Sequence, residues 1–205
     1  MGFDGIIAAC GNYIEMDGKV IYENNLSADM VQKVIRVLSE CKMPVVLEGS
    51  TDYWIDDEGF EDDPYVDYLF ESLGEHAHII RGYNGEIRIN KFSADVIDGT
   101  DYERVKTEFA DDFLILEHVE NVVEFVPKGT SKATGIKWLC NHLDIPLDET
   151  YAIGDSVNDL EMLESVGHGI AMGNSMPPAK EIAEYVTSDI SDDGVKNALK
   201  HYGLI

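Results

Sequence analysis

The clearest hydrophobic pattern in the chain lies between Tyr151 and Leu163. It begins with a short apolar run, turns at Gly154, and continues with apolar residues at helical spacing. This pattern predicts a buried strand that opens into a helix. From Val122 to the C-terminus, short apolar runs alternate with amphipathic segments, which predicts a parallel sheet covered by helices.

The first half of the chain contains both helix-like and strand-like hydrophobic patterns. A short apolar run over residues 4–9 predicts a buried strand, and Asp17-Gly18 within residues 14–22 predicts a hairpin. Helices are expected after Ser27, at Pro64, and at Thr100, which begins a capping-box pattern. The remaining strand-like runs are 45–47, 77–80, 86–90, 113–116 and 122–126, whereas 56–63 and 83–85 are typical of a loop and a turn.

Length and charge exclude several classes of function. With 205 residues the chain can form one large domain or two small ones. A net charge of -25 argues against nucleic acid and anionic membrane surfaces as partners. No apolar run approaches the ~20 residues of a membrane span, and no secretory signal is expected. The three cysteines lack a CxxC pair, so reduced thiols and a cytoplasmic location are expected.

Three polar residues follow the turn at Gly154, namely Asp155, Asn158 and Asp159. Ligands of open α/β sheets bind beyond the carboxyl ends of the strands, and two carboxylates one helical turn apart can hold Mg²⁺. Asp also favours the first turn of a helix because of the helix dipole. On spacing alone, a cation site and an acidic helix N-terminus are equally good interpretations.

Motifs on both sides of this stretch favour the cation site. Ser131-Lys132 precedes it, Ala171-Met-Gly-Asn174 follows it, and Ser191-Asp-Asp-Gly194 comes last. In this order the motifs resemble the Cof-like branch of the haloacid dehalogenase superfamily, from Val122 to the C-terminus. The resemblance implies an α/β fold with a partial, Rossmannoid parallel-sheet core. Residues 1–22 and 121–205 would form the core, and residues 23–120 an inserted α+β cap domain.

The resemblance also implies a Mg²⁺-dependent phosphatase that acts on small phosphorylated metabolites. Lys132 would balance the charge of the transferring phosphoryl group. Asp155 would be the main Mg²⁺ ligand, and Asp159 either a second acid at the metal or a partner for Lys132. Asn158 and Asn174 would contact the phosphate.

Two motifs of this family are missing from the 205 residues. The Asp-x-Asp-Gly-Thr motif would supply the nucleophile, and a Thr-Gly-Arg motif would supply a hydroxyl group. Residues 3–14 resemble what the family carries after the second motif. We therefore expect a truncated family member with little activity, and a non-catalytic binding or interaction module is the alternative.

The missing segment has a structural consequence. In the family the nucleophile strand lies beside Tyr151–Ile153, so this strand is expected to have an unpaired apolar edge. A second copy of the chain is the expected cover, giving a homo-oligomer. Pairing with residues 6–9, or a core half that stays loose while the cap folds, are the alternatives.

Cysteine and histidine add two weaker candidates. Cys10 stands where the family usually has an Asn that lines the site, and a small buried thiol is favoured over a reactive one. His76 and His78 lie on one side of a strand-like run. Surface histidines are favoured there over a metal site, because no third ligand is evident.

Overall fold

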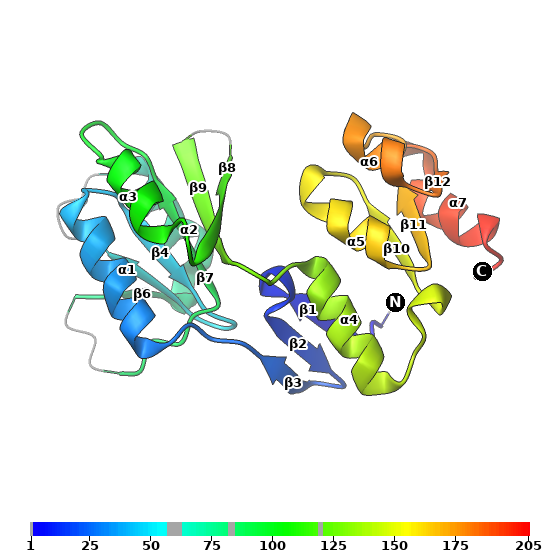
Figure 1. Ribbon diagram of the computed structural model, residues 1–205, viewed down its shortest axis with the longest axis horizontal. Helices are drawn as coiled ribbons and strands as arrows, with labels where there is room; N and C mark the ends of the chain where they lie inside the picture. Colours follow the sequence, from blue (N-terminus) through cyan, green and yellow to red (C-terminus); the bar gives the residue numbers. More distant parts are fainter. Residues whose placement is uncertain (1, 57–62, 82–84, 119–120) are drawn as a thin grey trace. The chain divides into compact units, whose positions relative to one another are not determined.

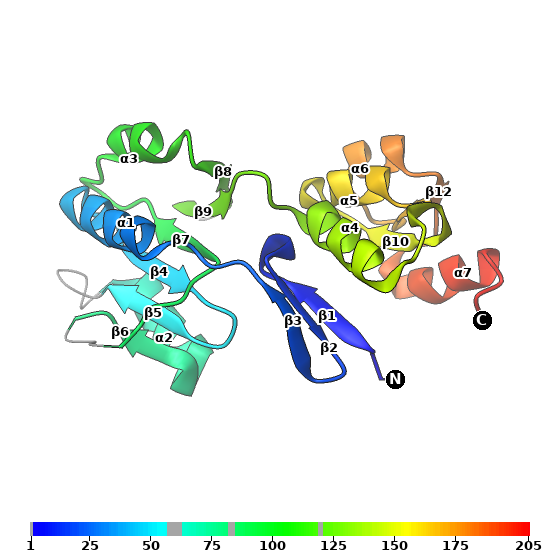
Figure 2. The same cartoon turned by 60° about the horizontal axis from the view of Figure 1, so that its bottom comes forward.

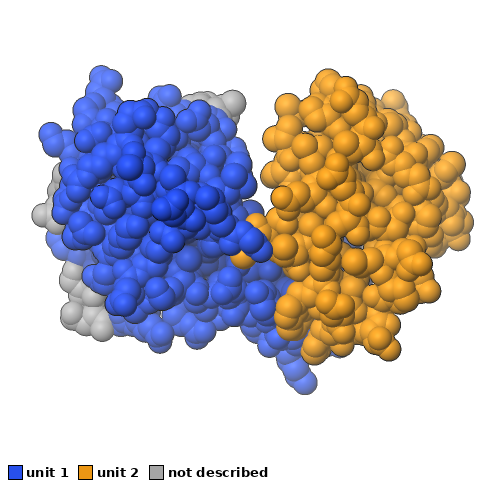
Figure 3. All heavy atoms as spheres, in the orientation of Figure 1, with its two compact units in different colours: residues 1–129 blue, residues 130–205 orange. Residues whose placement is uncertain are grey.

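The computed structural model describes residues 2–56, 63–81, 85–118 and 121–205. These form two compact units, residues 1–129 and residues 130–205 (Figure 3). The second unit begins at residue 130, whereas the predicted core segment begins at residue 121, and residues 1–22 belong to the first unit. The assignment of residues 1–22 to the family's core therefore stays a prediction.

The described residues of the first unit form two sheets and three α-helices (Figure 1). An antiparallel sheet of order β1-β2-β3 consists of β1 (Gly5–Ala8), β2 (Tyr13–Met16) and β3 (Lys19–Glu23). A mixed sheet of order β6-β5-β4-β7-β9-β8 consists of β4 (Val45–Glu48), β5 (Tyr53–Asp56), β6 (Ala77–Ile79), β7 (Lys91–Asp95), β8 (Phe113–Glu117) and β9 (Val122–Pro127). The helices are α1 (Ala28–Glu40), α2 (Pro64–Leu73) and α3 (Tyr102–Phe109).

The six-stranded sheet is covered on both faces. Helices α1 and α3 lie over one face and α2 over the other (Figure 2). The strand period of two explains this arrangement, because Val45 and Leu47 pack toward α1 while Val46 packs toward α2. Four phenylalanine rings fill the α1 side, with centroids 4.5 to 5.8 Å apart, and they are Phe92, Phe109, Phe113 and Phe125.

Helix starts follow the local sequence closely. Ser27 and Asp63 accept hydrogen bonds from the first-turn backbone amides of α1 and α2, as predicted. Helix α3 differs, because Asp101 caps it by accepting from the backbone amide of Arg104. The Thr100 hydroxyl donates to the carbonyl of Lys42 instead, so the predicted capping box is wrong.

Three expected strands also differ from the structure. Strand β9 pairs antiparallel with β7 and β8, so the parallel sheet does not begin at Val122. The run predicted at 86–90 precedes β7, which begins at Lys91. Strand β1 is not fully buried, because Ile6 is 58% exposed while Ile7 and Ala8 are half-buried. Most of the predicted loop at 56–63 and of the turn at 83–85 falls on residues 57–62 and 82–84, which lie outside the described residues.

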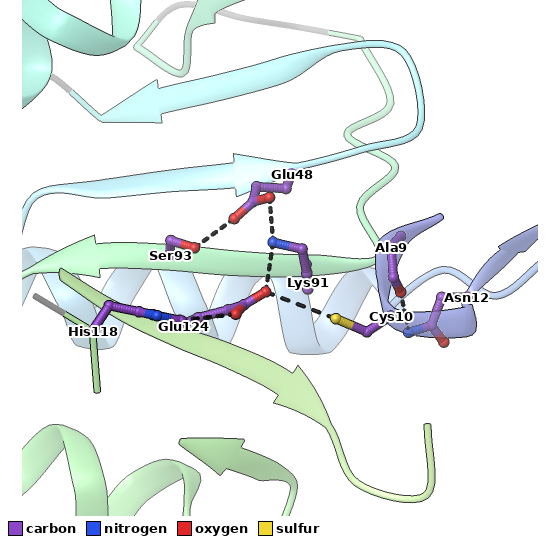
Figure 4. A network of polar contacts seen from close by, with 8 residues as sticks. All are labelled: Ala9, Cys10, Asn12, Glu48, Lys91, Ser93, His118 and Glu124. Carbon is purple, nitrogen blue, oxygen red and sulfur yellow. Dashed lines mark hydrogen bonds and ion pairs between the residues drawn. The ribbon is translucent and has the colours of Figure 1, made fainter. Parts of the chain in front are cut away.

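A nearly buried ion network crosses three strands of the six-stranded sheet (Figure 4). Lys91 on β7 pairs with Glu48 on β4, and its Nζ lies 2.9 Å from Glu124 Oε1 on β9. Their side chains are only 15 to 18% exposed. Burial by itself would lower the pKa of Lys91 and raise that of Glu124, but the mutual attraction is stronger. The pKa of Lys91 is raised and that of Glu124 lowered, so both are charged at neutral pH.

The turn between β1 and β2 rests on this network. Ala9 and Cys10 have φ values of 48° and 52°, a left-handed conformation that non-glycine residues rarely adopt. The half-buried thiol of Cys10 donates to Glu124 Oε1 at 3.8 Å. The fully buried Asn12 holds the turn through a 2.9 Å bond from its side-chain nitrogen to the Ala9 carbonyl.

The second unit is a parallel sheet of order β10-β11-β12 with four α-helices. Helices α5 and α6 pack on one face of the sheet, where Leu163, Ala152 and Ala179 form the core. On the other face, the ring of Tyr202, which directly follows α7, contacts Tyr151, His168 and Tyr185. The elements are β10 (Tyr151–Gly154), β11 (His168–Ala171), β12 (Tyr185–Val186), α4 (Lys132–Leu143), α5 (Leu160–Ser165), α6 (Pro177–Ile182) and α7 (Gly194–His201). None of the helices in the described residues has the length and apolar character needed to cross a membrane.

Replacing Lys91 by Met should lower the free energy of unfolding of the first unit by about 3–5 kcal/mol, because two nearly buried carboxylates lose their cation. The chain has two tryptophans, Trp54 and Trp138, one in each unit. Urea unfolding followed by Trp54 fluorescence in a Trp138→Phe background measures the change. Arg36→Met is the matched control, since its pair with Glu40 is exposed, and it should cost less than about 1 kcal/mol. If the two substitutions lowered the stability equally, the buried ion network around Lys91 would not stabilise the first unit more than an exposed ion pair does.

Candidate functional site

The predicted strand and helix at residues 151–163 are present in the second unit. Strand β10 ends at Gly154, residues Val157–Asp159 form a single 3₁₀ turn, and α5 follows. The polar residues therefore stand at the carboxyl end of a parallel strand, where α/β sheets place their ligands.

An ion pair connects this turn to the start of α4. Lys132 Nζ lies 2.6 Å from Asp159 Oδ1, and Asp159 Oδ2 accepts from the backbone amides of Asp155 at 3.0 Å and Ser156 at 3.2 Å. The Asp159 side chain is 6% exposed and that of Lys132 41%. Burial by itself would raise the pKa of Asp159, but these hydrogen bonds outweigh it and hold the pKa below its ordinary value.

The start of α4 explains why Lys132 needs this partner. Ser131 accepts from the backbone amide of Thr134, and the Thr134 hydroxyl is in turn hydrogen-bonded to Ser131, a reciprocal cap that fixes the first turn. A cation at the first helical position opposes the positive end of the helix dipole. Asp159 offsets this unfavourable field.

Gly154 is required by the packing of Asp159. A Cβ atom at residue 154 would lie 2.7 Å from the Cβ of Asp159 and 2.9 Å from its Cγ. Any side chain there would displace the carboxylate that holds Lys132. The sequence indicated a turn at this glycine, but not the close approach that requires it.

Asp155 presents a carboxylate to solvent. Its side chain is exposed, and the hydrogen bonds found between described residues do not include its carboxylate. Its backbone is fixed, because its amide donates to Asp159 and its carbonyl accepts from Met176 at 2.9 Å. The buried Ser175 adds a 3.2 Å bond from its hydroxyl to the Gly154 carbonyl, so the loop after β11 is attached to the end of β10. Ser175 was not predicted as a residue of the site, because only the pairing of β11 with β10 brings it close to Gly154.

The two predicted phosphate contacts lie on these two loops. The Asn158 side-chain oxygen accepts from the Ser156 hydroxyl, and that of Asn174 accepts from the backbone amide of Ile190 at 3.1 Å. Both residues are exposed. Their side-chain nitrogens are therefore the groups that could donate to a ligand.

The donor set suits only a largely hydrated cation. In the ranges that the structure describes, no three His, Cys, Asp or Glu residues are grouped so that they could hold a metal ion. Asp155 offers one carboxylate, whereas both oxygens of Asp159 are already hydrogen-bonded. Of the two roles expected for Asp159, the geometry supports that of partner to Lys132. The other metal candidate, His78, instead pairs with Asp52 at 2.7 Å.

Comparison with known proteins identifies the family. A family model described as haloacid dehalogenase-like hydrolase matches residues 1–199. The chain belongs to the haloacid dehalogenase-like hydrolases. Its mixed α/β fold agrees with this family, because a crystal structure of a hypothetical protein from Geobacillus kaustophilus HTA426 superposes with a TM-score of 0.85 at 26% identity. That match covers 98% of this chain and 77% of the other.

Two proteins similar to this chain come from Bacillus subtilis (strain 168). The protein named "Putative phosphatase YkrA" is 29% identical, over 100% of this chain and 78% of its own length. The protein named "Phosphatase YwpJ" is 42% identical over 46% of this chain and 33% of its own length.

Asp159→Asn should lower the stability of the second unit by about 1–3 kcal/mol at neutral pH, because Lys132 loses a charged acceptor. A depressed pKa stabilises the fold above the unfolded value of about 3.9 and loses that effect as the pH falls through the folded value. The wild type should therefore lose stability in acid, and the variant should show less of this dependence. Trp138 fluorescence in a Trp54→Phe background reports urea unfolding at each pH.

Asp155→Asn is the control for this experiment, since its carboxylate is exposed. It should leave both the stability and its pH dependence unchanged. If the two variants behave alike, the ion pair does not contribute to stability.

Proposed function

We propose that this chain is the phosphoryl-binding part of a Mg²⁺-dependent phosphatase of small phosphorylated metabolites. The observation that carries the proposal is the Lys132–Asp159 ion pair beside the exposed carboxylate of Asp155 at the end of β10. The names of YkrA and YwpJ, both of which contain the word phosphatase, support it.

Each site residue has a role in phosphoryl transfer, which depends mainly on positioning and charge stabilisation. Lys132 can neutralise a phosphoryl oxygen, while Asp159 holds its ammonium group in place. The side-chain nitrogens of Asn158 and Asn174 can donate to other phosphate oxygens. Asp155 would hold a magnesium ion, which when bound would neutralise negative charge on the phosphate.

We propose further that these 205 residues lack the catalytic nucleophile of the phosphatase reaction. The 205 residues contain no Asp-x-Asp-Gly-Thr motif, which by resemblance supplies the nucleophile. Without a covalent nucleophile the mechanism loses its defining step. We therefore expect the chain alone to bind weakly and to turn over very little.

A non-catalytic binding module remains the second candidate, and one observation favours it. Among the described residues, no group of acids converges to hold a metal. A module with this site would bind a phosphorylated ligand without cleaving it.

We also propose a cytoplasmic location and a small-molecule ligand for this chain. The three cysteines are free thiols, which agrees with a reducing, cytoplasmic location. The net charge of -25 disfavours nucleic acid and anionic membranes, so a small phosphorylated molecule is the expected ligand.

Mg²⁺ should bind weakly and through Asp155, because the described site supplies one free carboxylate and water must complete the octahedron. Titration calorimetry should show saturation only at about millimolar Mg²⁺ or above. Asp155→Ala should abolish the signal, while Glu164→Ala, an exposed acid on α5, should preserve it. Tight binding that survives Asp155→Ala would exclude this assignment.

Phosphatase turnover by the chain alone should be negligible with generic phosphate esters. A chimera that adds the part of YkrA outside the match should gain Mg²⁺-dependent phosphate release, and the chain alone should be slower by about 10⁴-fold or more. Phosphate release from protein purified away from host phosphatases measures both.

Lys132→Ala and Asp155→Ala should each reduce turnover of the chimera strongly, whereas Glu164→Ala should not. A folded chimera that binds phosphate but shows no turnover would favour the non-catalytic module. Robust turnover by the chain alone that is lost in Lys132→Ala would mean that another residue of the chain serves as nucleophile.

A further inference from the structure

Strand β8 forms one edge of the six-stranded sheet in the first unit (Figure 1). It pairs with β9 on one side, and among the described residues the strand order gives it no neighbour on the other. Its residues Phe113–Glu117 carry no charge before Glu117, and Leu114 is 51% exposed. An apolar edge of this kind is open to pairing with another strand. The family segment that these 205 residues lack is expected beside Tyr151–Ile153 in the second unit, not beside β8.

The antiparallel ladder with β9 decides which backbone groups of β8 face outward. The amide of His118 donates to the carbonyl of Val122 at 2.8 Å, and that of Lys128 to the carbonyl of Asp112 at 2.9 Å. Bonded and non-bonded pairs alternate along such a ladder, so Leu114 and the second residue after it also bond to β9. The other residues of the strand direct their N–H and C=O groups away from β9, and they are Phe113, Ile115 and Glu117. Between described residues, no hydrogen bond to these outward groups is found.

These outward groups are complementary to those of a second β8 strand. When two copies meet antiparallel about a two-fold axis at Ile115, this residue lies opposite its counterpart, and Phe113 of each copy lies opposite Glu117 of the other. Both residues of each such pair have N–H and C=O groups that face the partner, which is the hydrogen-bonded pair of an antiparallel ladder. All outward groups of the strand are then satisfied in both copies.

The same register matches the side chains. Leu114 and Leu116 stand on one face of the sheet, and Leu114 of each copy lies opposite Leu116 of the other. Such cross-strand apolar pairs stabilise antiparallel ladders. Glu117, the one charged residue of the strand, accepts a 3.0 Å hydrogen bond from the Tyr102 hydroxyl. The two Glu117 residues of a dimer would stand ~14 Å apart along the strands, farther than the Debye length of ~8 Å at physiological salt.

Titratable groups just beyond the strand ends also suit a second copy. In this register Asp112 of one copy approaches His118 of the other. Within each chain, Asp112 pairs with Lys33 at 3.5 Å and His118 with Glu124 at 3.1 Å. An acidic group therefore meets a basic one at both ends of the paired strands.

From this geometry we infer that the β8 edge is a homodimer interface, on which a second copy of the chain pairs antiparallel through residues 113–117. A second copy fits better than an unrelated strand, because Leu114, Ile115 and Leu116 each meet an apolar residue in the self-complementary register. The contact is isologous and closed, as in most symmetric dimers. Each copy carries a net charge of -25, so long-range repulsion opposes association and salt should strengthen it.

The opposite edge of the same sheet supplies a matched control. Ile79 on β6 is 44% exposed, close to the 51% of Leu114, and both are apolar. Light scattering coupled to size-exclusion chromatography, over a dilution series of the 205-residue chain, gives the dimer dissociation constant. Leu114→Lys should raise this constant by about tenfold or more, because each copy loses a leucine from the interface, and Ile79→Lys should leave it within about twofold. Both substitutions add the same charge. Added salt should lower the constant of the wild type.

Hydrogen exchange of the wild type provides a second readout that does not depend on a folded variant. The amides of Phe113, Ile115 and Glu117 should become protected as the protein concentration rises. Those of Leu114 and Leu116 already bond to β9 and should exchange slowly at every concentration. A wild type that stays monomeric at all concentrations would overturn the proposal. So would a dimer that both lysine variants weaken equally, or one that forms without protecting the outward amides of β8.

Discussion

The ion pair between Lys132 and Asp159 is the interaction on which the second unit's site depends. It joins the first residue of α4 to the turn after β10, and its carboxylate also receives the backbone amides of Asp155 and Ser156. One buried acid thus fixes the position of the ammonium group and shapes the turn that presents Asp155. Gly154 allows this arrangement because a larger residue would meet the Asp159 side chain at 2.7 Å. The Asp159 carboxylate therefore both neutralises Lys132 and fixes the backbone of the turn after β10.

The first unit contains a different ion network, which lies on one face of its large sheet. Its six-stranded sheet carries Lys91 between Glu48 and Glu124, with side chains 15 to 18% exposed (Figure 4). The opposite face is packed with phenylalanine rings. An ion network of this kind adds little net stability compared with apolar packing, but it strongly penalises the loss of any one member. The strained turn at Ala9 and Cys10 is held against the same network, so the short N-terminal sheet and the large sheet share one set of contacts.

In the second unit, β10 carries the candidate phosphoryl site at its carboxyl end. Asp155 projects from this strand end, and hydrogen bonds of its backbone to Asp159 and Met176 fix its position. The loop after β11 contributes to the same end of the sheet, because the Ser175 hydroxyl donates to the Gly154 carbonyl.

The sequence by itself determined several local elements and predicted the candidate site. The strand, turn and helix at residues 151–163, the cap at Ser131, and the choice of Lys132 and Asp155 follow from short-range patterns and from motif resemblance, because caps and periodicity act within a few residues. Only the tertiary structure showed that Asp159 pairs with Lys132, that β9 joins an antiparallel sheet, and that Asp101 rather than Thr100 caps α3. An apolar run is compatible with several neighbouring strands, and a carboxylate with several cations. The choice between them is made by contacts between residues far apart in the chain.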